Sequence, residues 1–357
     1  MEARAAVSVS IKDVAQKAGV SAGTVSNVFS GRRTVRPELA ARVRQAAEEL
    51  GYLPDRAASQ LRAGKAQVVA ALVPDLNNPF FTSLLAAIEA CLREEGFDLI
   101  VASANGAPAV ERTRLSALLA WRPAGLVVVP CTDDFAGREV IARTAVPFVV
   151  VDRVPASFTG DAVTVDNADA GRQAAGHLVA LGHRRIVVAA STLQLQNIRE
   201  RCEGIAGVLA AHGLAPPTLI EVGPDFETAT ERLAGLMAGG RHASAFLALT
   251  NFGTLGVLAS LQRAGLRVPH DVSVLGFDDY SWMRAVTPPL TAIRQPIDAL
   301  GRAVWQRLRA RIDGSTAPAS RVRLTCELVV RASTARPGGS GMTGPPATAL
   351  AGGLICR

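Results

Sequence analysis

The chain has 357 residues, of which 49% are hydrophobic and 19% are charged, which is typical of a soluble α/β protein with more than one domain. No apolar run is long enough to cross a bilayer, and the N-terminus leads into no apolar segment of the signal-peptide kind. These features predict a cytoplasmic protein without a membrane partner. The five cysteines are scattered and odd in number, which predicts reduced thiols and neither a disulfide framework nor a zinc site.

The positive charge is concentrated at the start of the chain. Residues 1–65 contain 11 Lys and Arg against 6 Asp and Glu, a difference of +5 within a total net charge of +7. A basic module beside a nearly neutral body is typical of a nucleic-acid-binding domain attached to a domain with another task. A solvated basic surface is the alternative that charge alone leaves open.

The first helix of residues 1–53 has clear start and stop signals. Ser10 is an N-cap with Asp13 three residues later, close to a capping box, and Gly19 ends the helix. Its apolar residues recur at helical spacing, at Ile11, Val14, Ala15 and Ala18. A helix that starts at Pro37 and ends at Gly51 is expected further on.

The helix between these two begins at Ser21 and is expected to pack inward through Val25, Val28 and Phe29. Two short helices joined by a tight glycine-containing turn form a helix-turn-helix. Its second helix would expose Ala22, Gly23, Ser26 and Asn27. Residues 19–23 also fit the G-x-S-x-G pattern of a nucleophilic serine, but that chemistry needs a preceding strand, whereas the spacing here is helical.

From residue 67 onward, short apolar runs alternate with helical stretches. Most of the runs are continuous in Val, Ile, Leu and Ala, as expected of strands buried on both faces of a parallel sheet: 68–73, 99–102, 126–129, 148–151, 186–190, 219–222, 246–249 and 272–277. Helices are expected over 80–95, 168–181, 199–212 and 254–264. The number of βα units favours two Rossmann-like lobes, with a ligand between them at the carboxyl ends of the strands.

The body shows no signature of catalysis. The first strand is followed by neither a G-x-G-x-x-G motif nor a P-loop, and the histidines have no metal-ligand spacing, so no cofactor is expected. Residues 182–185, which include His183, are interpreted as a solvated corner between a helix and a strand.

Several motifs of the first 54 residues resemble the headpiece of the lactose-repressor (LacI/GalR) family: Ile11-Lys12-Asp13-Val14-Ala15, Ala18-Gly19-Val20-Ser21, Thr24-Val25-Ser26 and Glu49-Leu50-Gly51-Tyr52-Leu53-Pro54. The resemblance implies that the second helix lies in the major groove of DNA. It places Ala22, Gly23 and Asn27 at base-reading positions and Thr24 and Ser26 on phosphates.

Residues 54–66 are assigned by the same resemblance to a hinge helix and linker. The family's hinge folds on DNA and pairs with its twin in a homodimer. The resemblance implies that Leu61 inserts into the central minor-groove step of a pseudo-palindromic operator, where an apolar wedge kinks the duplex.

The body, from about Val68 to Arg331, resembles the effector domain of the same family, which is similar to periplasmic sugar-binding proteins. Its landmarks include Asp75-Leu76-Asn77-Asn78-Pro79-Phe80-Phe81, Val151-Asp152-Arg153 and Gly276-Phe277-Asp278-Asp279. The resemblance implies a small sugar-like effector bound by Phe80, Phe81, Asp152, Arg153, Asn197, Arg201, Phe226, Asn251 and Asp278. Aromatic rings suit apolar sugar faces, while carboxylates and an Arg fork suit hydroxyl pairs. A core role is the alternative for Phe80 and Phe81.

The expected organisation is therefore a helix-turn-helix headpiece (1–53), a hinge and linker (54–66), a two-lobed effector-binding and dimerisation domain (67–335) and a disordered tail (336–357). Chain crossovers near Thr164, Arg294 and Leu324 would connect the lobes. The leading hypothesis is a ligand-responsive transcription regulator, by induction or by co-repression. A sugar-binding module of the transport type and an α/β enzyme are the alternatives.

Overall fold

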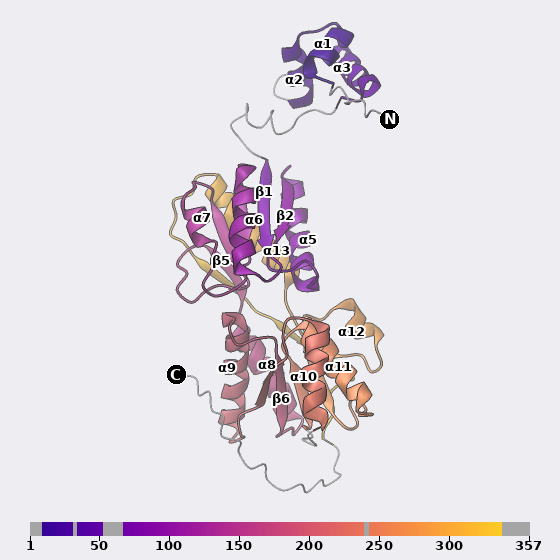
Figure 1. Cartoon of the computed structure of the whole chain (residues 1–357), viewed down its shortest axis with the longest axis vertical. Helices are drawn as coiled ribbons and strands as arrows, with labels where there is room; N and C mark the ends of the chain where they lie inside the picture. Colours follow the sequence, from indigo (N-terminus) through magenta and orange to yellow (C-terminus); the bar gives the residue numbers. More distant parts are fainter. Residues whose placement is uncertain (1–8, 31–33, 53–66, 239–242, 338–357) are drawn as a thin grey trace.

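The structure is a computed structural model that describes residues 9–30, 34–52, 67–238 and 243–337. It comprises a three-helix headpiece and a body of two α/β lobes (Figure 1), the fold class that the sequence predicted. The expected hinge helix with Leu61, and residues 338–357 of the expected tail, lie outside the described residues.

The headpiece helices are α1 (Ile11–Ala18), α2 (Ala22–Ser30) and α3 (Pro37–Leu50). The predicted capping box is present, because the Ser10 backbone N–H donates to Asp13 Oδ2 at 2.7 Å, and Gly19 ends α1 with a left-handed φ of 63°. One small core holds the three helices together, formed by Val14, Ala15, Ala18, Val25, Val43, Ala46 and Ala47.

Phe29 does not pack inward as predicted. It is 38% exposed, and its ring lies beside that of Tyr52, with the centroids 5.9 Å apart. Val25, one turn earlier, is fully buried. The inward face of α2 therefore ends before Phe29, which covers the edge of the headpiece.

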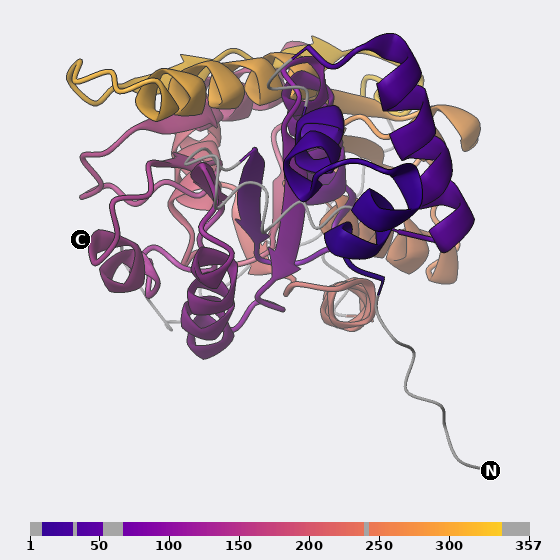
Figure 2. The ribbon, with the colours of Figure 1, turned by 90° about the horizontal axis from the view of Figure 1, so that it is seen from above.

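Lobe 1 contains a six-stranded parallel sheet in the order β11-β5-β4-β3-β1-β2. Its strands are β1 (Val68–Val73), β2 (Asp98–Ser103), β3 (Gly125–Val128), β4 (Phe148–Val151), β5 (Ala162–Val165) and β11 (Arg321–Leu324). Its helices are α5 (Pro79–Glu94), α6 (Pro108–Ala120), α7 (Arg138–Ala142) and α13 (Ile297–Ile312). The side chains of α5 and α13 join one hydrophobic core, and those of α6 and α7 join another; Figure 2 shows α13 along one side of the molecule.

Lobe 2 has a second six-stranded sheet in the order β12-β10-β9-β8-β6-β7, parallel except for the β10–β12 pair. Its strands are β6 (Ile186–Ala190), β7 (Thr218–Glu221), β8 (Ala245–Ala248), β9 (Ser273–Phe277), β10 (Thr291–Arg294) and β12 (Glu327–Val329). Its helices are α8 (Asn167–Ala180), α9 (Gln196–Ala211), α10 (Phe226–Ala238), α11 (Asn251–Arg263) and α12 (Ser281–Ala285).

The chain passes between the lobes three times, after β5, after β10 and after β11. These are the crossovers expected near Thr164, Arg294 and Leu324. Strands β1, β3, β4, β6, β8 and β9 are parallel, so the polar residues that follow them gather at the carboxyl edge of each sheet. The two carboxyl edges face each other across the crossovers (Figure 1).

The interpretation of residues 182–185 as a solvated corner is wrong for His183, which is only 1% exposed. Its ring lies 3.0 Å from Ser244 Oγ, 3.1 Å from Ser273 Oγ and 2.9 Å from the carbonyl of Ala335. These partners come from distant parts of the chain and satisfy both ring nitrogens, which is why the imidazole can be buried although its neighbours in the sequence are polar. His183 thereby fastens the last described residues to lobe 2.

Two glycines let helices α8 and α9 approach closely. A Cβ on Gly204 would lie 2.0 Å from the carbonyl oxygen of Ala168, and one on Gly171 would lie 2.2 Å from that of Arg201. Both contacts are with backbone, which cannot move aside as a flexible side chain can. The glycines therefore fix α9, and with it the position of Arg201, against α8.

We predict opposite effects for two alanine substitutions on the same helix. Gly204→Ala should lower the free energy of unfolding by about 1–3 kcal/mol, the usual result of overpacking. Gly207→Ala is the control, because its Cβ would meet nothing within 4 Å, and it should raise stability by up to about 1 kcal/mol through helix propensity. Urea unfolding followed by circular dichroism measures both, and equal effects would contradict the close contact.

A second prediction concerns pH. Burial lowers the pKa of His183 below its usual value; the hydrogen bond to the Ala335 carbonyl opposes this in part, and the nearby His177 adds a smaller lowering effect. The unfolded chain therefore takes up a proton at higher pH than the folded chain does. The contribution of His183 to the free energy of unfolding should be constant above about pH 7 and should fall as the pH decreases below about 6.5.

Urea midpoints from pH 8 to pH 5 test this expectation. In His183→Gln the decline should be shallower, although stability at pH 8 is reduced by the lost hydrogen bonds. His212→Gln, at an exposed position, should keep the wild-type profile. If the dependence of stability on pH were as steep in His183→Gln as in the wild type, the buried imidazole would not be the cause of the decline.

Candidate ligand site and DNA interface

Helix α2 carries the expected DNA-reading residues, but they are less exposed than predicted, because Ala22 packs against the headpiece core. Gly23 is exposed, and Ala22, Thr24, Ser26 and Asn27 are half-buried. Ser21 Oγ accepts a hydrogen bond from the Thr24 backbone N–H at 3.1 Å and lies 3.0 Å from Thr24 Oγ1. The serine is thus an N-cap, as the sequence predicted, and not a nucleophile.

Two aspartates end strands at the facing edges of the two sheets. Asp152 follows β4 in lobe 1, and Asp278 follows β9 in lobe 2. Both have left-handed backbone conformations, with φ of 61° and 82°, and Asp279 has a φ of 50°. Residues other than glycine adopt such angles at a cost, and these conformations cluster at functional sites. We refer to the surroundings of Asp152 and Asp278 as the interlobe face.

Arg201 provides the positive charge that lobe 2 contributes to the interlobe face. It projects from α9, is 4% exposed, and donates through Nε to Asn167 Oδ1 at 2.9 Å and through Nη1 to the Leu249 carbonyl at 2.7 Å. Its guanidinium carbon lies 3.8 Å from the centroid of the Phe277 ring. These contacts fix the orientation of a charged group that is otherwise removed from water.

The two carboxyl groups are strongly desolvated. Burial raises the pKa of Asp152 and of Asp278, while the charge of Arg201 opposes the rise in both. Asp152 Oδ2 accepts from Asn197 Nδ2 at 3.2 Å. Asp278 accepts from Gln295 Nε2 at 2.6 Å and from the Tyr280 hydroxyl at 3.2 Å. Because Asn197 belongs to lobe 2, its bond to Asp152 joins the two lobes.

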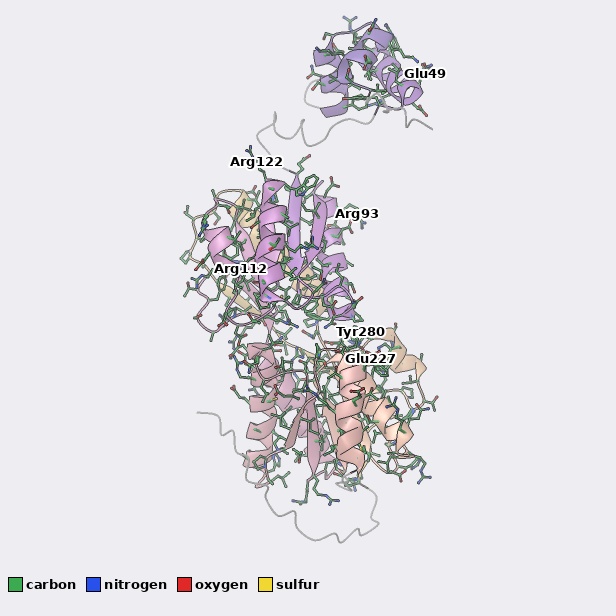
Figure 3. All side chains as sticks on the ribbon, viewed as in Figure 1. Glu49, Arg93, Arg112, Arg122, Glu227 and Tyr280 are labelled. Carbon is green, nitrogen blue, oxygen red and sulfur yellow. The ribbon has the colours of Figure 1, made fainter. Side chains whose placement is uncertain are left out.

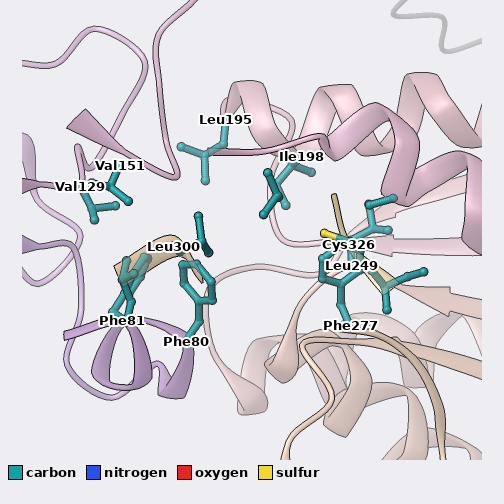
Figure 4. Close-up of a cluster of buried hydrophobic side chains, with 14 of the residues drawn as sticks. Phe80, Phe81, Val129, Val151, Leu195, Ile198, Leu249, Phe277, Leu300 and Cys326 are labelled. Atoms are coloured by element: carbon teal, nitrogen blue, oxygen red, sulfur yellow. The ribbon is translucent and has the colours of Figure 1, made fainter. Parts of the chain in front are cut away.

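Phe80 and Phe81 have the core role that the sequence left open as an alternative, and their contact with a ligand stays a prediction. They are 5% and 2% exposed and belong to the large hydrophobic cluster, so they are core residues. They also lie where that cluster reaches the interlobe face, opposite Leu195, Ile198, Leu249 and Phe277 of lobe 2 (Figure 4). Arg153 lies over the Phe81 ring at 5.3 Å and donates to the Cys131 carbonyl at 3.2 Å.

The remaining expected residues are less closely associated. Asn251 begins α11, is 4% exposed and accepts through Oδ1 from Trp282 Nε1 at 3.2 Å. Phe226 begins α10 and is half-buried. No ring contact joins Phe226 to the other expected residues within the described part of the chain.

Sequence reasoning missed three polar side chains of the interlobe face. Asn167 (1% exposed) orients Arg201, Gln295 (5%) orients Asp278, and Tyr280 donates to Asp278. Gln295 Oε1 is buried and has no partner among the described residues, so it can accept a hydrogen bond from a ligand. The available signal was position, since Gln295 directly follows β10 and Asn167 lies two residues after β5, both at crossovers. Figure 3 shows Tyr280 at the upper edge of lobe 2.

Other kinds of site find no support in the described ranges. No group of three or more His, Cys, Asp or Glu side chains there could hold a metal ion. No helix of these ranges is long and apolar enough to cross a membrane.

Comparison with known proteins identifies the chain. Residues 10–55 match the bacterial regulatory proteins of the lacI family, and residues 175–334 match a periplasmic binding protein-like domain. The transcriptional regulator PtxS of Pseudomonas plecoglossicida is 33% identical over 91% of this chain and 96% of its own length. The ribose operon repressor of Escherichia coli is 32% identical over 90% of this chain and 99% of its own.

Solved structures agree. The Lac repressor dimer bound to operator matches 92% of this chain and 99% of its own, with a TM-score of 0.81 and 28% identity. The regulator CelR in complex with cellobiose matches 91% and 99%, with a TM-score of 0.70 and 28% identity. The chain belongs to the lacI family of bacterial transcriptional regulators, which confirms the family resemblance of both its headpiece and its body.

Proposed function

We propose that this chain is a cytoplasmic, homodimeric repressor whose affinity for a pseudo-palindromic operator is controlled by a small sugar-like ligand at the interlobe face. The observation that carries the proposal is the arrangement of Asp152, Arg201 and Asp278, which are buried together where the two lobes meet. The domain limits are those expected from the sequence: headpiece 1–53, hinge and linker 54–66, ligand-binding and dimerisation domain 67–335, and tail 336–357.

The chemistry of the interlobe face suits a ligand rich in hydroxyl groups. The two carboxylates accept hydrogen bonds, and Arg201 and Asn197 donate them. The aromatic rings of Phe80 and Phe81 offer apolar surface nearby. Arg153 and Arg201 formally balance Asp152 and Asp278, so the site has no net charge that would demand an ion. Phe226 and Asn251 complete the proposed binding set.

Two similar structures support this class of ligand. One is a complex of CelR with cellobiose, and the other, a LacI family regulator from Enterococcus faecium that is 28% identical with a TM-score of 0.69, contains bound ribose. On the DNA side, we assign base reading to Ala22, Gly23 and Asn27 and phosphate binding to Thr24 and Ser26, because the family resemblance places them there and none of them is fully buried.

A thermal-shift screen against D-ribose, cellobiose, sugar acids and nucleosides tests the ligand site. A compound at a hundred times its Kd should stabilise the folded state by about 2.7 kcal/mol and raise the midpoint by several degrees. The shift should vanish in Asp278→Asn and Arg201→Met and persist in Glu139→Gln, an exposed control on α7. A shift that survives both site substitutions would place the ligand elsewhere.

The active compound should then change the affinity of the protein for its operator, selected from a random duplex pool. Reciprocity requires the operator to change ligand affinity by the same factor. Tighter DNA binding would show co-repression, and weaker binding would show induction. Operator affinity that is independent of a bound ligand would contradict the proposed control.

The hinge assignment gives a separate prediction. Leu61→Ala should weaken binding to the selected operator by roughly tenfold or more, about 1.4 kcal/mol, because the kinked duplex loses its wedge. Binding to a random duplex, which depends on phosphate contacts, should change little. Gln60→Ala serves as the neighbouring control in fluorescence-anisotropy titrations. Equal losses on both duplexes would exclude the wedge.

A further inference from the structure

Helix α9, which carries Asn197 and Arg201, has an N-cap residue that cannot cap it through its side chain. Its N-cap residue is Leu195, which makes no side-chain cap hydrogen bond and is buried in the hydrophobic cluster. The first N–H groups of a helix have no intrahelical partners. A Ser, Thr, Asp or Asn side chain at the N-cap usually accepts from one of them. Within the first turn, Asn197 Oδ1 accepts from the backbone N–H of Ile198 at 2.9 Å, which leaves the N–H of Gln196, the first residue of the helix, to find an acceptor elsewhere.

Lobe 1 supplies it. Asp133, in the loop between β3 and α7, accepts a hydrogen bond through Oδ1 from the backbone N–H of Gln196, the first residue of α9, at 3.1 Å. Its Oδ2 forms an ion pair with Arg199 within the same helical turn. Arg199 is itself oriented by donating to the Leu193 carbonyl at 2.8 Å and to Gln196 Oε1 at 2.7 Å. A carboxylate of one lobe thus caps a helix of the other.

The loop that carries Asp133 is fixed from inside lobe 1. Glu111 of α6 is 0% exposed, and its carboxylate accepts from the backbone N–H groups of Cys131 at 2.6 Å and Gly137 at 2.9 Å. These two amides flank Asp133 on either side. A buried carboxylate is retained only where its hydrogen bonds are satisfied, and here they hold both ends of the loop. Arg153 bonds to the same loop through the Cys131 carbonyl.

We propose that Asp133 is a positioning residue that caps α9 from the opposite lobe, so that the first turn of α9 is fully ordered only while the lobes are in contact. The inference rests on the proposed function, in which Asn197 and Arg201 bind the ligand. Separation of the lobes removes the cap and the ion pair together. A change in the arrangement of the lobes therefore also changes how well the first turn of α9, with its ligand-binding residues, is ordered.

Hydrogen exchange of the full chain, measured without ligand by mass spectrometry, tests the cap. In Asp133→Ala the amides of residues 196–200 should exchange about two- to thirtyfold faster, the factor that corresponds to loss of an N-cap. Asp133→Asn keeps an acceptor and Arg199→Gln keeps the carboxylate, so both should cause smaller increases. Asp134→Ala, at the exposed neighbouring position, is the matched control and should leave exchange unchanged.

A charge reversal separates capping from ion pairing. Asp133→Lys combined with Arg199→Glu restores an ion pair but offers no acceptor to Gln196. Fast exchange in this double variant supports the cap even if Asp133→Ala folds poorly, and wild-type exchange overturns it.

Two other results would also overturn the proposal. One is an equal effect of Asp133→Asn and Asp133→Ala. The other is faster exchange confined to residues 131–137 with a lower thermal midpoint, as a role local to lobe 1 would produce. Because no ligand is present, a ligand screen without hits would count against the proposed function and leave this result standing.

Discussion

The guanidinium of Arg201 is buried where two sheets end, and two desolvated carboxyl groups depend on its charge, one from each lobe. Removing one partner of a buried charge cluster is expensive, because the others are left uncompensated in a medium that solvates them poorly. Asp152 belongs to lobe 1, whereas Arg201 and Asp278 belong to lobe 2. The arrangement of the lobes therefore determines whether the buried charges of the interlobe face are compensated.

The rest of the body holds this cluster in place. The close contact of α8 and α9 at Gly171 and Gly204 fixes the helix that carries Arg201, and left-handed backbone at Asp152 and Asp278 follows each strand end. Three crossovers confine relative movement of the lobes to short connections, as in hinge-type domain closure. Lobe 1 begins at β1, directly after the segment that leads from the headpiece. The amino end of β1 lies at the edge of the sheet opposite the interlobe face (Figure 1), so a change in lobe arrangement has to be transmitted through lobe 1 to reach the headpiece.

Much of this was predictable from local patterns, and the exceptions share a cause. The continuous apolar runs at β1, β4, β6 and β9 predicted these strands to within a residue or two. Strand β11 has no such run, because it lies at a sheet edge, where Arg321 and Arg323 alternate with apolar residues. His183 stands beside two arginines in the sequence, so the local pattern did not indicate that its side chain is buried. Asp152, Arg201 and Asp278 stood out as charges beside apolar segments. Asp133 did not, because its role depends on a loop of one lobe meeting a helix of the other.

This dependence on two lobes suits a regulator. A ligand shifts a conformational equilibrium only by the difference between its affinities for the two states. A site contained in one lobe would bind equally well in either arrangement and would control nothing. At the interlobe face, Asp152 comes from one lobe and Asp278 from the other, and the first turn of α9 takes its cap from Asp133 across the boundary. A ligand that contacts both aspartates must prefer the arrangement in which they are close, so binding itself supplies the difference in affinity that control of DNA binding requires.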